Sequence, residues 1–120
     1  MENIAIFASG AGSNAENIIR HFHLSHLAAV RAVFTNNPLA GVIERAARSG
    51  VECLLFSRGD FSDEAAPVLR LLAEREIDFI VLAGFLWLMP PAIIEAYRGR
   101  IINIHPIHTE PRNNLIVEGL

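Results

Sequence analysis

The chain has 120 residues, of which 52% are apolar, and ten basic and thirteen acidic residues give it a formal net charge of −3. This length and apolar fraction suit one compact domain and exclude a disordered polymer. The acidic balance argues against nucleic acid as a partner, because such binding rests on a basic surface. All ten basic residues are arginines, which excludes a P-loop lysine and a Schiff-base lysine.

Cysteine content and hydropathy indicate where in the cell the chain is expected. Cys53 is the only cysteine, so neither an intramolecular disulfide nor a Cys-x-x-Cys centre can form. Glu2 stands where a secretory leader would carry positive charge, and we therefore expect a cytoplasmic location. The longest uncharged run, residues 79–94, is shorter than the roughly 20 apolar residues that span a bilayer and is interrupted by glycine and proline. We expect no membrane partner.

Short apolar runs alternate with helical patterns along the first half of the chain. The run from Ile4 to Ala8, followed by glycines, predicts a strand buried on both faces. Residues 13–16, Ser-Asn-Ala-Glu, have the spacing of a capping box and predict the start of a helix. Residues 28–35 predict a second strand, which ends at the turn cluster Asn-Asn-Pro over 36–38.

The alternation continues through the second half. Helical spacing over 42–47 predicts a helix that ends near Gly50, and residues 53–56 predict a third strand. Residues 63–76 predict a helix with carboxylates early and arginines later, as the helix dipole prefers. The remaining predicted elements are a strand over 77–82, a helix over 91–97 and a strand over 101–104. This order predicts an α/β fold, a Rossmann-like open parallel sheet with helices on both faces.

Ligands of open parallel sheets bind beyond the carboxyl ends of the strands. Three unusual segments directly follow predicted strands: residues 9–14, 83–89 and 103–106. The first, Ser-Gly-Ala-Gly-Ser-Asn, joins a strand to a helix, so its glycines permit a tight turn and its amides face an anion at the positive helix end. We predict phosphate binding there, and a plain tight turn is the alternative.

The same loop also satisfies G-x-G-x-x-A over residues 10–15, so a dinucleotide site is a rival interpretation. An NAD site requires an acidic residue about 20 positions further on, at the end of the second strand. This chain has Phe-Thr-Asn-Asn over 34–37, without an acid. An NAD-dependent oxidoreductase domain and a non-catalytic nucleotide-binding module remain the alternative functions.

Asn103 and His105 lie two residues apart at the end of the last predicted strand and therefore project from the same face. Pro106 keeps the backbone at His105 extended. An imidazole suits proton transfer near neutral pH, and a neighbouring amide can stabilise a developing oxyanion. The pair is a candidate for acyl transfer, with a hydrogen-bonded structural histidine as the alternative.

Residues 83–91 place an apolar, aromatic loop at the same predicted edge, which suits a pocket for a flat heterocycle. Ordinary core packing is the alternative for Phe85 and Leu88. His21, His23 and His26 have no i, i+4 pair and no acidic or thiol companion, so we expect no metal site. Cys53, within an apolar strand, is expected to behave as a small hydrophobe.

Three motifs in register resemble those of the phosphoribosylglycinamide formyltransferases, also called glycinamide ribonucleotide transformylases. They are Ser-Gly-x-Gly-Ser-Asn over 9–14, Leu-Ala-Gly-Phe over 82–85 and Asn-Ile-His-Pro over 103–106. The resemblance divides the chain into an N-terminal formyltransferase domain, residues 1–106, and a tail, residues 107–120. It implies transfer of a formyl group from 10-formyltetrahydrofolate to the amine of glycinamide ribonucleotide in de novo purine biosynthesis.

The resemblance also implies roles for single residues. It assigns phosphate binding to Gly12, Ser13 and Asn14, folate binding to Leu86, Trp87, Leu88 and Met89, and catalysis to Asn103 and His105. Trp87 replaces an arginine found in some members of the family, and Asp63 falls near a basic position that contacts the folate. The implied partners are glycinamide ribonucleotide and a reduced folate.

The sequence departs from the family after Pro106. Members usually continue Ser-Leu-Leu-Pro and then a long second half, in which an aspartate orients the catalytic histidine. Here residues 107–114 read Ile-His-Thr-Glu-Pro-Arg-Asn-Asn and the chain ends at Leu120. We therefore expect a truncation or a shifted reading frame, with very weak formyl transfer because the histidine lacks its carboxylate. Apolar surface left uncovered near residues 85–89 would favour a homo-oligomer.

Overall fold

The computed structural model describes residues 1–106 and 115–119, and side chains as far as Ile104. The elements are β1 (Glu2–Phe7), α1 (Ser13–Phe22), β2 (Ala28–Thr35), α2 (Val42–Arg48), β3 (Glu52–Leu55), the 3₁₀ turn η1 (Gly59–Phe61), α3 (Ala66–Glu74), β4 (Phe79–Ala83), α4 (Pro91–Ala96), β5 (Ile101–Pro106) and β6 (Leu115–Gly119). The strands form one sheet in the order β3-β2-β1-β4-β5-β6.

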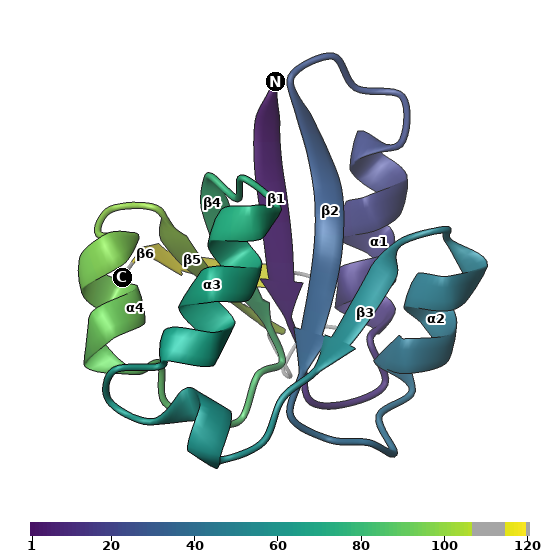
Figure 1. Cartoon of the computed structure of the whole chain (residues 1–120). Coiled ribbons are helices and arrows are strands. Elements are labelled where there is room, and N and C mark those ends of the chain that lie inside the picture. The colour runs from purple at the N-terminus through teal and green to yellow at the C-terminus, as the bar shows by residue number, and fades with distance from the viewer. Residues whose placement is uncertain (107–114, 120) are drawn as a thin grey trace.

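Strands β1 to β5 are parallel to one another. In Figure 1, α1 and α2 lie on one side of the sheet and α3 and α4 on the other. The predicted Rossmann-like parallel sheet with helices on both faces is therefore confirmed. The arrowheads of β1 and β2 point to the lower edge in that view, where the strands give way to their loops.

Two apolar layers hold the sheet between its helices. On the side of α3 and α4, the rings of Phe7 and Phe34 stack with centroids 4.8 Å apart in a cluster that includes both helices. On the side of α1 and α2, Ile6 and Val33 pack in a second cluster with Val42. Burial on both faces explains why the strands read as continuous apolar runs rather than alternating patterns.

The start of α1 differs from the predicted capping box. Gly12 is the N-cap residue, and it has no side chain to cap the helix. Ser13 is the first helical residue, and the carboxylate of Glu16 lies 2.7 Å from Nη1 of Arg45 in α2. The capping box is wrong because the glutamate side chain is held by an arginine from the neighbouring helix instead of turning back to the N-cap amide.

The helix predicted over 63–76 is shorter than expected. It begins at Ala66, because Ala65 adopts a left-handed conformation with φ of 46°. Asp63 and Glu64 therefore precede α3, and its first turn contains no acidic residue. The expected match of early carboxylates to the helix dipole is wrong for this helix.

The sixth strand lies in the segment that the sequence analysis left without an element. β6 runs antiparallel to β5, with Asn103 opposite Glu118 and His105 opposite Ile116. Its apolar run, Leu-Ile-Val over 115–117, is too short to distinguish from loop by periodicity alone. In the structure this strand pairs with the free side of β5, which would otherwise be an unpaired sheet edge.

Candidate functional site

The strand order reverses between β1 and β4, since β2 and β3 continue on one side of this pair and β5 on the other. Such a switch point opens a crevice at the carboxyl ends of the strands, where ligands of these sheets bind. The amide of Ser9, after β1, donates to the carbonyl of Gly84, after β4, at 3.3 Å. The two loops that border the crevice are thus joined by their backbones.

Strand register places Asn103 and His105 at the same edge. Leu82 is level with Phe7 of β1 and with Asn103 of β5. His105 is two residues further along β5, so its backbone extends past the level at which β1 ends. The structure brings the glycine loop and the Asn103–His105 pair to one rim, while the imidazole itself lies outside what the structure describes.

The glycine loop, residues 10–14, is shaped by close contact between the starts of two helices. Gly12 has φ of 81°, and a Cβ built on it would lie 2.5 Å from Cγ2 of Val42 in α2. The Val42 amide donates to the carbonyl of Gly10 at 3.1 Å. The loop therefore passes under α2 before it enters α1, and only glycine satisfies both the conformation and the space at position 12.

A small cavity of about 140 Å³ opens beside this loop. It is lined by Gly10, Ala11, Gly12, Ser13, Asn14, Ala83 and Gly84. One water occupies roughly 30 Å³ in the liquid, so the cavity has room for a small anion. The first amides of α1 and the positive end of its dipole are suited to hold negative charge there.

Residues 84–90 alternate between solvent and core. Leu86 and Leu88 are 82% and 93% exposed, whereas Met89 is buried in the core. Phe85 and Trp87 are half-buried against the aromatic cluster beneath the rim. The four residues assigned to folate binding are therefore not equivalent: two leucines offer apolar surface to a ligand, and the methionine supports the loop from inside.

Trp87 has a cationic neighbour that the sequence analysis did not identify. The guanidinium carbon of Arg58 lies 3.8 Å from the centroid of the Trp87 ring. The same ring contacts Phe56 and Phe61, with centroids 6.0 and 6.1 Å away. The sequence shows Arg58 only as part of a Ser-Arg-Gly turn after β3. Its contact with Trp87, 29 positions later, depends on the tertiary fold and could not be predicted from that turn.

Ser9 is a second rim residue that the sequence analysis did not assign a role. It is 4% exposed, and its hydroxyl accepts the Leu86 amide at 3.0 Å while it donates to Oδ1 of Asn36 at 2.7 Å. Its carbonyl accepts Nδ2 of Asn37 at 3.2 Å. The signal in the sequence was a serine directly after a buried strand, where a hydroxyl needs hydrogen-bond partners.

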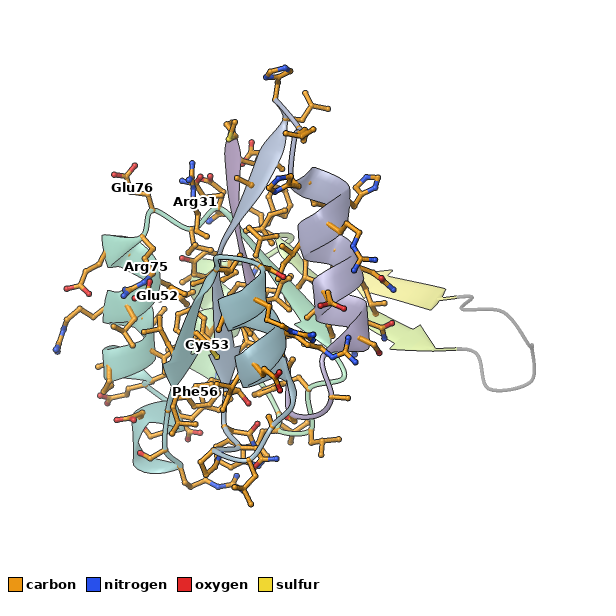
Figure 2. All side chains as sticks on the ribbon, turned by 90° about the vertical axis from the view of Figure 1, so that its right-hand side faces the viewer. Arg31, Glu52, Cys53, Phe56, Arg75 and Glu76 are labelled. Carbon is orange, nitrogen blue, oxygen red and sulfur yellow. The ribbon has the colours of Figure 1, made fainter. Side chains whose placement is uncertain are left out.

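The clearest pKa shifts concern residues away from this rim. Burial raises the pKa of the Cys53 thiol, which is half-buried on β3, and this disfavours the reactive thiolate. Glu52 and Arg75 form an ion pair between β3 and α3, seen beside Cys53 in Figure 2. Neither observation gives β3 a chemical role, in agreement with the expectation for Cys53.

A larger cavity lies elsewhere in the described part of the chain. It measures about 570 Å³ and is lined by Glu16, Ile19, Arg20, His21, His23, Leu24, Ser25, Arg48 and Ser49. Its arginines are mostly solvent-exposed and pair with Glu16, and no strand ends there, so we favour the smaller cavity at the switch point. Among the side chains in the described part of the chain, no three metal-ligating groups gather. No helix in that part is long and apolar enough to cross a membrane.

Comparison with known proteins gives a consistent result. The family model described as formyl transferase matches residues 2–107. Phosphoribosylglycinamide formyltransferase of Bacillus subtilis is 36% identical over 110 residues, covering 88% of this chain and 56% of the relative. The Escherichia coli protein of that name is 36% identical over 108 residues, covering 87% of this chain and 51% of the relative.

Solved structures agree with these relatives. Glycinamide ribonucleotide transformylase 1 of Geobacillus kaustophilus superposes with a TM-score of 0.80 at 43% identity, covering 88% of this chain and 58% of that structure. Phosphoribosylglycinamide formyltransferase of Brucella melitensis gives 0.80 at 37% identity, covering 92% and 61%. The chain spans about half the length of the curated relatives it matches.

Proposed function

The chain belongs to the formyl transferase family, and on that premise we propose that residues 1–106 form the N-terminal domain of a phosphoribosylglycinamide formyltransferase. The reaction transfers a formyl group from 10-formyltetrahydrofolate to the amine of glycinamide ribonucleotide in purine biosynthesis. The observation that carries this proposal is the convergence of the glycine loop, the apolar loop and the Asn103–His105 strand end at one switch point. A free thiol, Cys53, fits a reducing cytoplasm.

In this proposal the phosphate of glycinamide ribonucleotide occupies the cavity beside Gly12, Ser13 and Asn14. Backbone amides at the start of a helix of ten residues, free of side-chain caps, are available to the phosphate oxygens. The hydroxyl of Ser13 and the amide of Asn14 supply further donors from the cavity wall. The phosphate thereby fixes one end of the acceptor, and its amine can extend toward β5.

The reduced folate occupies the adjoining loop. Leu86, Trp87 and Leu88 provide apolar and aromatic surface for its flat ring system, and Met89 anchors that loop in the core. The formyl donor acts as a co-substrate, because its formyl group leaves with each turnover. Binding at two adjoining loops brings the formyl carbon near the amine and replaces a bimolecular encounter by a local reaction.

Asn103 and His105 carry the chemistry. When the acceptor amine attacks the formyl carbon, negative charge develops on the formyl oxygen, and the Asn103 amide stabilises it. His105 manages the proton that the attacking amine loses and the leaving folate amine gains. Asn103 lies on the sheet face that carries Leu82 and Phe7, by register, which is also the face of the aromatic cluster.

Calorimetric titration of the chain with glycinamide ribonucleotide, a reduced folate and NAD tests the proposal. We expect the first two to bind and NAD not to bind. Binding of the ribonucleotide alone would favour a non-catalytic nucleotide-binding module, and binding of NAD would favour the oxidoreductase alternative. Ser13→Ala and Asn14→Ala are expected to weaken binding of the ribonucleotide without changing the affinity for the folate, because each removes one hydrogen bond to the phosphate.

We also propose that the free chain self-associates through the exposed leucines of the apolar loop. Leu86 and Leu88 flank Trp87 in the sequence, and both are exposed among the described residues. Exposed apolar patches of this kind drive association. Analytical ultracentrifugation at increasing concentration should show dimers or larger species, and Leu88→Ser should reduce them. A strict monomer at high concentration would contradict this.

A further inference from the structure

We propose that Ser9 couples the phosphate loop to the folate loop, so that occupation of one changes the affinity of the other. This inference rests on the proposed function, because it concerns the two ligands assigned to these loops. Ser9 is a positioning residue: it lines neither ligand, but it contacts both segments that do. Its partners Asn36 and Leu86 are 27 and 77 positions away in sequence.

The geometry makes Ser9 a junction of three loops. The next residue in the chain, Gly10, begins the phosphate loop. The hydroxyl of Ser9 accepts a hydrogen bond from the amide of Leu86 in the folate loop. The backbone amide of Ser9 donates to the carbonyl of Gly84. The third loop follows β2 and contributes Asn36 and Asn37. Asn36 accepts a hydrogen bond from the Ser9 hydroxyl, and Asn37 donates one to the Ser9 carbonyl.

Burial makes this junction specific. Ser9 is 4% exposed, so a displaced Ser9 would leave its buried hydroxyl without a partner. A buried polar group without a hydrogen-bond partner destabilises the fold. Movement of the phosphate loop therefore shifts the folate loop with it, rather than breaking the contact. The proposed coupling passes through these hydrogen bonds.

Trp87 offers a direct readout of this coupling. It is the only tryptophan of the chain and stands in the folate loop, one residue after Leu86. A ligand that binds only at the phosphate loop should therefore change Trp87 fluorescence through Ser9. Glycinamide ribonucleotide is the probe, titrated once by calorimetry and once by Trp87 fluorescence. Both titrations of the unmodified chain should give the same dissociation constant.

Ser9→Ala is the informative variant, because it removes both side-chain hydrogen bonds of Ser9 and replaces no residue of the phosphate loop, residues 10–14. The ribonucleotide should still release heat, while the Trp87 response should fall to less than half. In the unmodified chain the reduced folate should tighten ribonucleotide binding by roughly fivefold or more, a typical coupling, and in Ser9→Ala by less than twofold. A full Trp87 response in Ser9→Ala would overturn the inference.

Ser25→Ala is the matched control. Ser25 also accepts a backbone amide, that of Leu27 at 3.0 Å, but at the opposite end of β2. This variant should retain the full response. Asn36→Ala, which removes the acceptor of the Ser9 hydroxyl while keeping the Leu86 contact, should give an intermediate response. It also provides the test if Ser9→Ala proves too unstable to purify.

Amide hydrogen exchange without ligand separates this inference from the proposed function. Ser9→Ala should raise exchange at residues 84–86 and also at residues 10–14 and 36–37, whereas Ser25→Ala should not. If the ribonucleotide releases no heat with the unmodified chain, the proposed function fails and exchange alone decides the coupling. Faster exchange confined to residues 84–86 would overturn it.

Discussion

A Cβ at position 12 would lie 2.5 Å from Cγ2 and 2.6 Å from Cβ of Val42, so Gly12 touches the first residue of α2 with its backbone. No arrangement of a flexible side-chain end can relieve this contact, because Val42 is branched at Cβ and fully buried. The start of α1, where the phosphate is proposed to bind, is thereby set against the start of α2.

Gly12→Ala should destabilise the chain by about 2–4 kcal/mol, since it combines the clash with a φ of 81° that alanine tolerates poorly. Urea unfolding followed by circular dichroism measures the change. Gly10→Ala is the control: a Cβ there meets nothing within 4 Å, so stability should change by less than about 1 kcal/mol. Equal losses for both variants would contradict the role of Val42.

Arg58→Ala should expose the Trp87 ring that the guanidinium covers. We expect a shift of Trp87 fluorescence to longer wavelength and a stability loss of about 0.5–1 kcal/mol, the usual range for an exposed cation–π pair. Arg98→Ala, which removes an exposed arginine paired with Glu95, should leave the emission unchanged.

Phe7→Ala should cost about 3–5 kcal/mol, because it empties the centre of the aromatic cluster under the rim. The Phe7 ring contacts those of Phe34, Phe56, Phe61 and Phe85, with centroids 4.8, 5.9, 6.1 and 5.5 Å away. Thermal and denaturant unfolding measure the loss. Leu39→Ala, at a position that is 90% exposed, should stay within about 0.5 kcal/mol of the unmodified chain.

The ion pair of Glu52 and Arg75 predicts a small dependence of stability on pH. Its hydrogen bond from Arg75 lowers the pKa of Glu52. A depressed carboxylate pKa stabilises the fold above the unfolded value of about 4.3, and this contribution is lost as the pH falls through the folded pKa. The Glu52 side chain is 49% exposed, so solvent screening limits the contribution to about 0.2–1 kcal/mol.

Glu52→Gln should therefore be less stable than the unmodified chain at pH 7 and equally stable near pH 3. High salt should also narrow the difference at pH 7. Glu74→Gln is the matched control, since Glu74 lies 3.7 Å from the same arginine and is 58% exposed. It should show a smaller effect or none. An unchanged difference between the two pH values would refute the pairing.

Strands and their order along the chain were predictable, because strands buried on both faces leave continuous apolar runs between turn residues. Residues 28–35 coincide with β2. Helix starts were less predictable, since they depended on contacts with distant residues: Arg45 holds Glu16, and the left-handed Ala65 delays α3. β6 was missed because its pairing with β5, rather than its own pattern, makes it a strand.

The position of the candidate site in the fold was predictable where its pattern lies within a few adjacent residues. The glycine loop follows β1 and Asn103–His105 lie in the second half of β5, and parallel topology brings both to one edge. Ser9 and Arg58 escaped notice because their importance lies in partners 77 and 29 positions away, which no local pattern encodes. The alternation of exposed and buried residues over 86–89 likewise emerges only when the loop packs on the aromatic cluster.

The pairing of β1 with β4 has a consequence for synthesis of the chain. When the first 56 residues have emerged from the ribosome, β1, β2 and β3 are free to pair, yet neither Ala83 nor Gly84 of the cavity wall has emerged. Contacts of such long sequence separation also form late in folding. The nascent chain should therefore acquire affinity for the ribonucleotide abruptly, when β4 leaves the exit tunnel and pairs with β1.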